Sequence, residues 1–158
     1  FGKILENVWG AKRFLIFYII TGLGAALIHL LITQYQIISL SNQFPELLDL
    51  AVEGRYNTGI GISKRLTQLV ITPTVGASGA VFGLLLAFGM LFPNTLLYIY
   101  FAIPIKAKYF VMVYGAIELY SGLSNNPADN VAHFAHLGGM LFGYILIRYW
   151  KTNSDSFY

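Results

Sequence analysis

The stretch at residues 76–92, GASGAVFGLLLAFGMLF, contains no charged residue and a single hydroxyl group. It approaches the length of about 20 apolar residues that a helix needs to cross a lipid bilayer. Three further segments, residues 14–38, 109–123 and 130–150, are similarly apolar. Together these segments predict an all-α protein whose helices span a membrane.

The composition of the chain also indicates a lipid environment. Hydrophobic residues make up 56% of the 158 residues and charged residues only 11%, whereas about 25% of a soluble domain is charged. Cysteine is absent, which excludes disulfides, thiol nucleophiles and thiolate metal sites. We therefore expect a single domain over residues 1–158, a polytopic transmembrane helix bundle with four complete spans and the end of a preceding one.

Two connecting regions do not fit a spanning helix. Residues 95–103 are apolar, but nine residues rise only about 14 Å as a helix, against a hydrocarbon core of about 30 Å. Residues 39–74 mix glycine, proline and charged residues with a short amphipathic run. This mixture predicts a structured, water-facing loop.

The basic residues indicate an orientation rather than a nucleic-acid partner. The net charge is +3, but the basic residues are spread over short connections and form no patch for nucleic acid. Short cytoplasmic loops collect Lys and Arg. If the start of the chain is cytoplasmic, seven of the ten basic residues lie inside: Lys3, Lys12, Arg13, Lys106, Lys108, Arg148 and Lys151. We expect an integral, multi-pass protein of the cell membrane, in which segments 76–92 and 130–150 both begin on the extracytoplasmic side.

Ser78 stands at the start of its segment in the motif Gly76-Ala77-Ser78-Gly79. Glycines around a hydroxyl allow another backbone to approach closely and leave the Ser78 amide accessible. Taken alone, Ser78 is equally explained as a small residue for helix packing. A candidate nucleophile needs a partner base.

His136, inside the last apolar segment, is the candidate general base, because ionisable side chains within spans are functional by default. Ser78 precedes Phe92 by 14 residues and His136 precedes Arg148 by 12, which places them about 21 Å and 18 Å above the inner ends of their helices. The two levels nearly coincide. In such an arrangement His136 takes the Ser78 proton during attack on a peptide carbonyl and returns it to the leaving amine.

Glycines four residues apart accompany both side chains. Gly79 and Gly83 follow Ser78, and Gly139 and Gly143 follow His136. Such glycine faces allow two membrane helices to approach closely. The backbone amide of Ser78 would then donate to the oxyanion of the reaction.

The remaining ionisable residues predict a dyad without a third acid. Asp129 lies seven residues before His136, about 10 Å along a helix, and Glu118 belongs to another segment. We interpret Glu118 as a structural hydrogen-bond partner and His29 as a packed or interfacial histidine.

A metal site is the alternative use of the histidines. Asp129, His133 and His136 follow i, i+4, i+7 spacing and could hold a metal on one helix face. Neither a fourth ligand nor an HExxH pattern is evident in the apolar segments. We therefore expect no metal and no cofactor, with a metal-binding or transport protein as the alternative.

Three ordered motifs make the chain similar to the rhomboid family of intramembrane serine proteases. They are the motif around Ser78, the motif Ala135-His136-Leu137-Gly138-Gly139 and a turn at Glu6-Asn7-Val8-Trp9-Gly10. The resemblance implies that the four segments are the family's third to sixth helices, with residues 109–123 as the gate. It implies a serine endopeptidase that cleaves single-span membrane proteins in or near a weakened transmembrane helix, without a cofactor.

Two departures from the family pattern accompany the resemblance. The family's first helix and an HxxxN element, whose Asn donates to the oxyanion, would lie before Phe1. A catalytically impaired rhomboid-like protein that binds client transmembrane helices is therefore a further alternative. Phe82 stands four residues after Ser78, where many relatives have a Tyr that stacks on the catalytic imidazole, so stacking is retained without the hydroxyl.

Overall fold

The computed structural model describes residues 1–43, 45, 69, 77–99, 102–124 and 132–153. Five helices and one hairpin are found there: α1 (Gly2–Trp9), α2 (Ala11–Gln43), α5 (Ser78–Leu91), β1 (Leu96–Ile99), β2 (Ile103–Lys106), α6 (Ala107–Ser124) and α7 (His133–Asn153). The prediction of a helical bundle is confirmed. The apolar run at 95–103, which is too short to span as a helix, contributes to an antiparallel hairpin in which Leu96 pairs with Lys106.

Gly10 separates α1 from α2. Its φ of 77° and ψ of 157° lie in a region that is essentially restricted to glycine. The Gly10 amide donates to the Glu6 carbonyl at 2.7 Å and its own carbonyl accepts from Phe14. The helix therefore ends and a new one starts within a single residue, so α1 lies against the beginning of α2.

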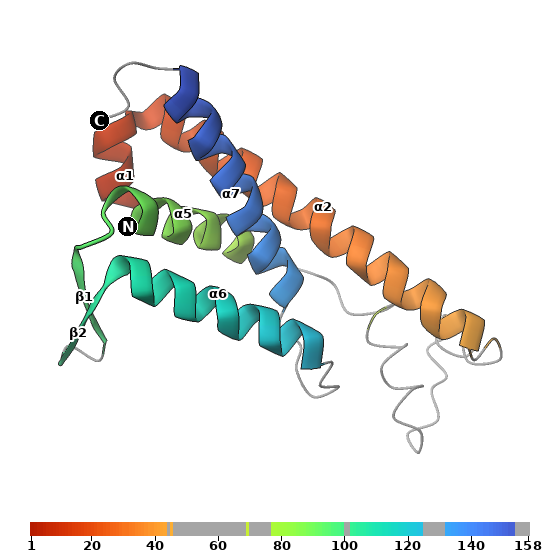
Figure 1. Cartoon of the computed structure of the whole chain (residues 1–158). Helices are drawn as coiled ribbons and strands as arrows, with labels where there is room; N and C mark the ends of the chain where they lie inside the picture. The colour runs from red at the N-terminus through yellow and green to blue at the C-terminus, as the bar shows by residue number, and fades with distance from the viewer. Residues whose placement is uncertain (44, 46–68, 70–76, 100–101, 125–131, 154–158) are drawn as a thin grey trace.

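Helix α7 packs against α2, α5 and α6, and α5 also lies against α2 (Figure 1). The main core lies where α1, the start of α2, the end of α5, the start of α6 and the end of α7 meet. Trp9 packs there, with its ring centroid 4.9 Å from that of Phe17 and 5.5 Å from that of Trp150. The buried members of the core are Leu5, Trp9, Phe17, Leu84, Ala87, Phe88, Ala107 and Ile147.

Helices α5 and α7 cross with their backbones in direct contact. A Cβ added to Gly139 would overlap the carbonyl oxygen of Gly79, and one added to Gly83 would lie 3.0 Å from the carbonyl oxygen of Gly139. Thr21 of α2 would lie 2.8 Å from the same added Cβ at Gly83, and it donates its hydroxyl to the Phe17 carbonyl at 2.8 Å. This glycine crossing holds the first turn of α5 beside the start of α7.

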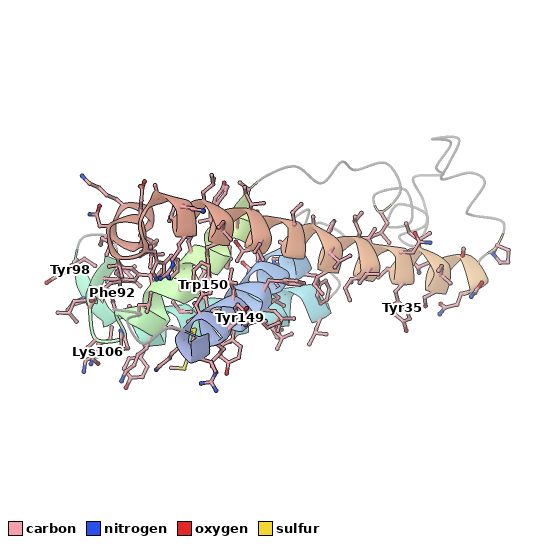
Figure 2. The ribbon with its side chains drawn as sticks, turned by 90° about the horizontal axis from the view of Figure 1, so that it is seen from above. Tyr35, Phe92, Tyr98, Lys106, Tyr149 and Trp150 are labelled. Atoms are coloured by element: carbon pink, nitrogen blue, oxygen red, sulfur yellow. The ribbon has the colours of Figure 1, made fainter. Side chains whose placement is uncertain are left out.

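Large apolar side chains cover the outside of the bundle. On α2, Leu23, Leu30 and Tyr35 are 68%, 65% and 70% exposed, and Figure 2 shows Tyr35 on the part of α2 that extends beyond the other helices. Exposed apolar surface of this extent indicates contact with lipid or protein. Among the described helices, α2 is the one whose length and apolar composition alone suffice to identify a membrane span, while α5 is apolar but has 14 residues.

The helix bounds refine the predicted segments. Segment 14–38 lies within α2, 109–123 lies within α6, and α7 extends three residues beyond the predicted end at 150. Helix α5 is shorter than the full span predicted at 76–92, and Gly76 lies outside the described residues. Most of the predicted loop at 39–74 also lies outside them, and its first residues belong to α2.

Candidate active site

Ser78 and His136 come together from the first turns of α5 and α7. The Ser78 Oγ atom lies 2.9 Å from Nε2 of His136. Ser78 is exposed, whereas His136 is only 7% exposed. A reachable hydroxyl bonded to a sheltered imidazole is the geometry that nucleophile activation requires.

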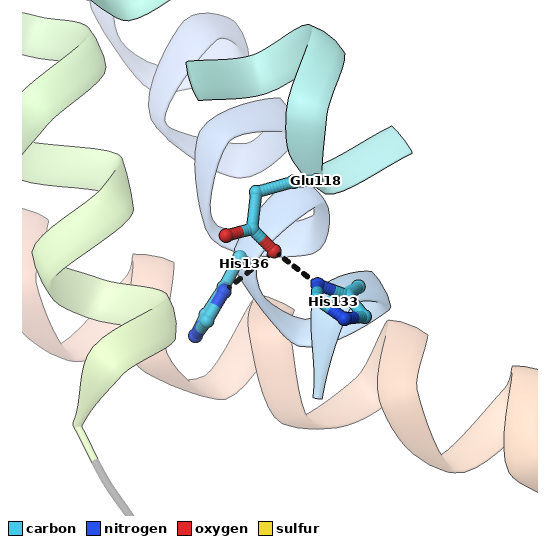
Figure 3. A group of neighbouring side chains, drawn as sticks. All are labelled: Glu118, His133 and His136. Atoms are coloured by element: carbon cyan, nitrogen blue, oxygen red, sulfur yellow. Dashed lines mark hydrogen bonds and ion pairs between the residues drawn. The ribbon is translucent and has the colours of Figure 1, made fainter. Parts of the chain in front are cut away.

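Glu118 of α6 contacts the other side of the same imidazole. Its Oε2 atom lies 2.9 Å from Nδ1 of His136 and 2.7 Å from Nδ1 of His133, as Figure 3 shows. Glu118 is 8% exposed. A buried carboxylate needs pairing and hydrogen bonds, and the contacts with the Nδ1 atoms of the two imidazoles supply them.

The expectation that no acid lies within reach of His136 is therefore wrong. Glu118 lies six residues before the end of α6, and His136 lies three residues after the start of α7. Since these consecutive helices pack alongside each other, the two positions reach a common level. The distance along a single helix excludes Asp129 as a partner of His136. It carries no information about a contact between two helices, such as that between Glu118 and His136.

Phe82 lies one turn after Ser78 on α5. Its ring stacks on the His136 imidazole with a centroid separation of 4.1 Å and an interplanar angle of 7°. The Phe82 ring also lies near that of Tyr114 of α6, with 6.3 Å between the two ring centroids. Stacking on one face and hydrogen bonds at both nitrogens fix the orientation of the imidazole.

Backbone amides are available beside Ser78. Helix α5 begins at Ser78, and its N-cap residue Ala77 forms no side-chain cap. The first amides of an α-helix have no partner within the helix, and those of Ser78, which is exposed, and of Gly79, which is buried, belong to this first turn. Gly76, the other glycine predicted here, lies outside the described residues.

In the structure, a different carboxylate from the predicted one lies beside the two histidines of the alternative metal site. Asp129 lies outside the described residues, and the carboxylate that joins His133 and His136 is that of Glu118. Their ligand atoms all lie within 4.8 Å of one another. His29, on α2, is not part of this group.

The family model described as the Rhomboid domain matches residues 1–151. The chain belongs to the rhomboid family. This rhomboid chain is 35% identical over 89 residues to an uncharacterized mitochondrial rhomboid protein of Schizosaccharomyces pombe. The match covers 52% of the chain and 23% of that relative, so the chain spans a small part of the relative's length. No solved structure matches this chain.

Family membership, together with the apolar helix α2, indicates a membrane protein. In the rhomboid chain, the motif at Glu6-Asn7-Val8-Trp9-Gly10 lies far from Ser78 in sequence and contributes Trp9 to the core. The other two motifs supply Ser78 and His136. For Glu118, a carboxylate inside an apolar helix is a sequence signal for a buried polar partner, but the sequence does not name that partner.

Proposed function

We propose that this protein is an intramembrane serine endopeptidase, with Ser78 as the nucleophile and His136 as the general base. The observation that carries the proposal is the 2.9 Å contact between Ser78 Oγ and His136 Nε2. The rhomboid family supports a protease-like function in general. The assignment of roles to individual residues rests on the geometry of the site.

Glu118 adds a third member to the predicted dyad. A carboxylate only accepts hydrogen bonds, so its contact with Nδ1 of His136 requires a proton on that nitrogen. Nε2 of the neutral imidazole is then the unprotonated atom, and it accepts the Ser78 hydroxyl proton. When the imidazole becomes positively charged during attack, the Glu118 carboxylate stabilises it.

The start of α5 offers the oxyanion a binding place. As the hydroxyl oxygen of Ser78 bonds to the substrate carbonyl carbon, negative charge develops on the carbonyl oxygen. The amides of Ser78 and Gly79 and the positive end of the helix dipole stabilise that charge. Gly76 stays a candidate for this oxyanion site on the basis of the sequence.

The length of α5 supports a site below the membrane surface. Fourteen residues rise about 21 Å, against a hydrocarbon core of about 30 Å. If Leu91 lies at the inner edge of the core, Ser78 ends well short of the outer edge. Hydrolysis requires water at this depth, and Ser78 is an exposed residue.

The distribution of charge supports a multi-pass protein whose site faces the extracytoplasmic side. The ends of the bundle that hold α1, the hairpin and the end of α7 carry the basic residues Lys3, Lys106, Lys108, Arg148 and Lys151. Ser78 is the first residue of α5 and His136 lies in the first turn of α7, so both lie at the helix ends opposite Leu91 and Arg148. Basic residues favour the cytoplasmic side, so α2, α5, α6 and α7 would cross outward, inward, outward and inward.

The substrates that we propose are single-span membrane proteins. A site within the bilayer receives a peptide bond from a transmembrane segment, and that segment must unwind locally because a helix hides its carbonyls in internal hydrogen bonds. The lipid bilayer is the other partner, and no nucleic acid is involved.

The proposal is tested by cleavage of a reporter transmembrane segment and by fluorophosphonate labelling, using the full-length protein in detergent and in liposomes. Wild-type protein is expected to cleave the reporter and to be labelled at Ser78. Ser78→Ala and His136→Ala should abolish both, whereas Ser41→Ala should affect neither, because Ser41 is a partly exposed residue near the end of α2 whose hydroxyl bonds to the Ile38 carbonyl. A wild-type protein that is neither labelled nor active, yet binds transmembrane clients, would replace the protease by the impaired rhomboid-like protein.

A further inference from the structure

His133 lies beside the proposed catalytic machinery without a role in peptide hydrolysis. Its Nδ1 atom shares the Oε2 oxygen of Glu118 with Nδ1 of His136. His133 is the first residue of α7, with a side chain that is 12% exposed, and Glu118 and His136 are sheltered to a similar degree. Two imidazole nitrogens of α7 therefore contact the same carboxylate oxygen of α6 (Figure 3).

We propose that Glu118, His133 and His136 bind a zinc ion, and that this ion reversibly inhibits the protease proposed above. The proposal deepens that function, because it assigns a regulatory ligand to the same site. The three ligand atoms already lie within 4.8 Å of one another. Two imidazoles and one carboxylate, with the fourth position open to water, form a donor set that zinc accepts.

Zinc fits this site with a small adjustment. Zinc bonds to nitrogen and oxygen at about 2.0–2.2 Å, which separates neighbouring ligand atoms by about 3.3–3.6 Å in a tetrahedral arrangement. The two nitrogen–oxygen distances of 2.7 and 2.9 Å need to widen by about 0.4–0.9 Å to reach that geometry, and the two nitrogens, which lie within 4.8 Å of each other, need to take up the same spacing. Side-chain rotation of Glu118 and of His133, at the end of its helix, can supply that change.

Zinc at Nδ1 removes the basic nitrogen of His136. A neutral imidazole carries one proton, and a metal on Nδ1 leaves that proton on Nε2. Nε2 would then donate to Ser78 Oγ across the same 2.9 Å contact, and it could not accept the hydroxyl proton. The ion also withdraws Glu118 from its pairing with His136. The nucleophile is therefore not activated while zinc is bound.

The metal itself is measured first, in a background without proteolysis. Purified full-length Ser78→Ala protein is dialysed against zinc, and the zinc content per chain is determined by mass spectrometry. We expect one zinc per chain, a large loss of binding in Ser78→Ala/His133→Ala, and no loss in the matched control Ser78→Ala/His29→Ala. Equal zinc content in the His133 and His29 variants, or less than stoichiometric zinc in Ser78→Ala, would overturn the proposal.

Inhibition is measured second, with each variant compared with its own rate in the presence of a chelator. Zinc should inhibit wild-type protein and His29→Ala at the same concentration, and His133→Ala should need at least about tenfold more, because one of three protein ligands is lost. Magnesium should not inhibit, since it prefers an all-oxygen shell. Equal zinc sensitivity of His133→Ala and wild type would contradict regulation at this site. If the wild type cleaves no reporter at all, the proposed function fails, and the binding measurement alone decides whether the cluster is a zinc site.

Discussion

Glu118 and Ser78 lie on opposite sides of the His136 imidazole: Oε2 of Glu118 is 2.9 Å from Nδ1, and Oγ of Ser78 is 2.9 Å from Nε2. Since Glu118 and Ser78 come from different helices, the packing of α5, α6 and α7 determines the orientation of the imidazole. In the proposed mechanism, the carboxylate selects the tautomer in which Nε2 is the base.

Replacing Glu118 by Gln should lower kcat by about 10²- to 10⁴-fold with little change in KM. A neutral amide does not stabilise the imidazolium, and its NH₂ group can turn toward Nδ1 and reverse the tautomer. Reporter cleavage gives kcat and KM, and the rate of fluorophosphonate labelling should fall in parallel. Glu118→Asp should recover part of the loss. A Glu118→Gln protein with wild-type kcat and a lowered melting temperature would leave Glu118 with a structural role alone.

Phe82→Ala should lower kcat, whereas Phe82→Tyr should be tolerated. The stacked ring lies 4.1 Å from the imidazole, and an aromatic pair contributes about 0.5–1.5 kcal/mol beyond its buried area, equivalent to about a two- to tenfold change in rate. Tyr keeps the ring. Comparing reporter cleavage by Phe82→Ala, Phe82→Leu and Phe82→Tyr separates stacking from volume: equal rates for Leu and Tyr would show that the ring plane is irrelevant.

Gly10→Ala should destabilise the protein by about 1–3 kcal/mol, because an Ala cannot adopt the backbone conformation of Gly10 without strain. The φ of 77° places Gly10 in a glycine-only region, and nothing lies within 4 Å of an added Cβ. The cost is therefore conformational rather than steric. Unfolding in denaturing detergent, followed by circular dichroism, measures it; a Gly10→Ala protein as stable as wild type would show that α1 and α2 join in another way.

The sequence predicts the helical segments well because each segment shows its own pattern. Residues 14–38 and 109–123 are apolar runs that end at polar residues, and α2 and α6 enclose them. The levels of Ser78 and His136 also follow from counting residues along each helix. Their 2.9 Å contact requires only that two helices with glycine faces lie side by side.

Other features depend on contacts that a linear pattern does not contain. Glu118 meets His136 because α6 packs on α7 at one particular rotation, and rotation is set by side-chain packing rather than by hydropathy. The span predicted at 76–92 is longer than α5 because apolar residues continue beyond the helix: Phe92 follows its end and belongs to the residues packed against the core. An apolar pattern gives the extent of a buried segment, not of a helix.

Gly139→Ala should be more damaging than Gly10→Ala. An added Cβ at Gly139 would overlap the backbone carbonyl of Gly79, and a backbone cannot move aside as the end of a flexible side chain can. Forcing α5 and α7 apart costs about 1–3 kcal/mol or more, and it also separates Ser78 from His136, so reporter cleavage should fall even in the protein that remains folded.

The matched control is Gly22→Ala, on α2. The Cβ added there would lie 3.5 Å from the Cβ of Ala80, an ordinary contact, and Ala is favoured over Gly within a helix by about 0.5–1 kcal/mol. Gly22→Ala should therefore be as stable as wild type or slightly more stable. Unfolding midpoints in detergent and reporter cleavage are compared for the two variants. Similar behaviour of Gly139→Ala and Gly22→Ala would mean that α5 and α7 do not cross backbone to backbone, and that the Ser78–His136 contact is held by something other than this crossing.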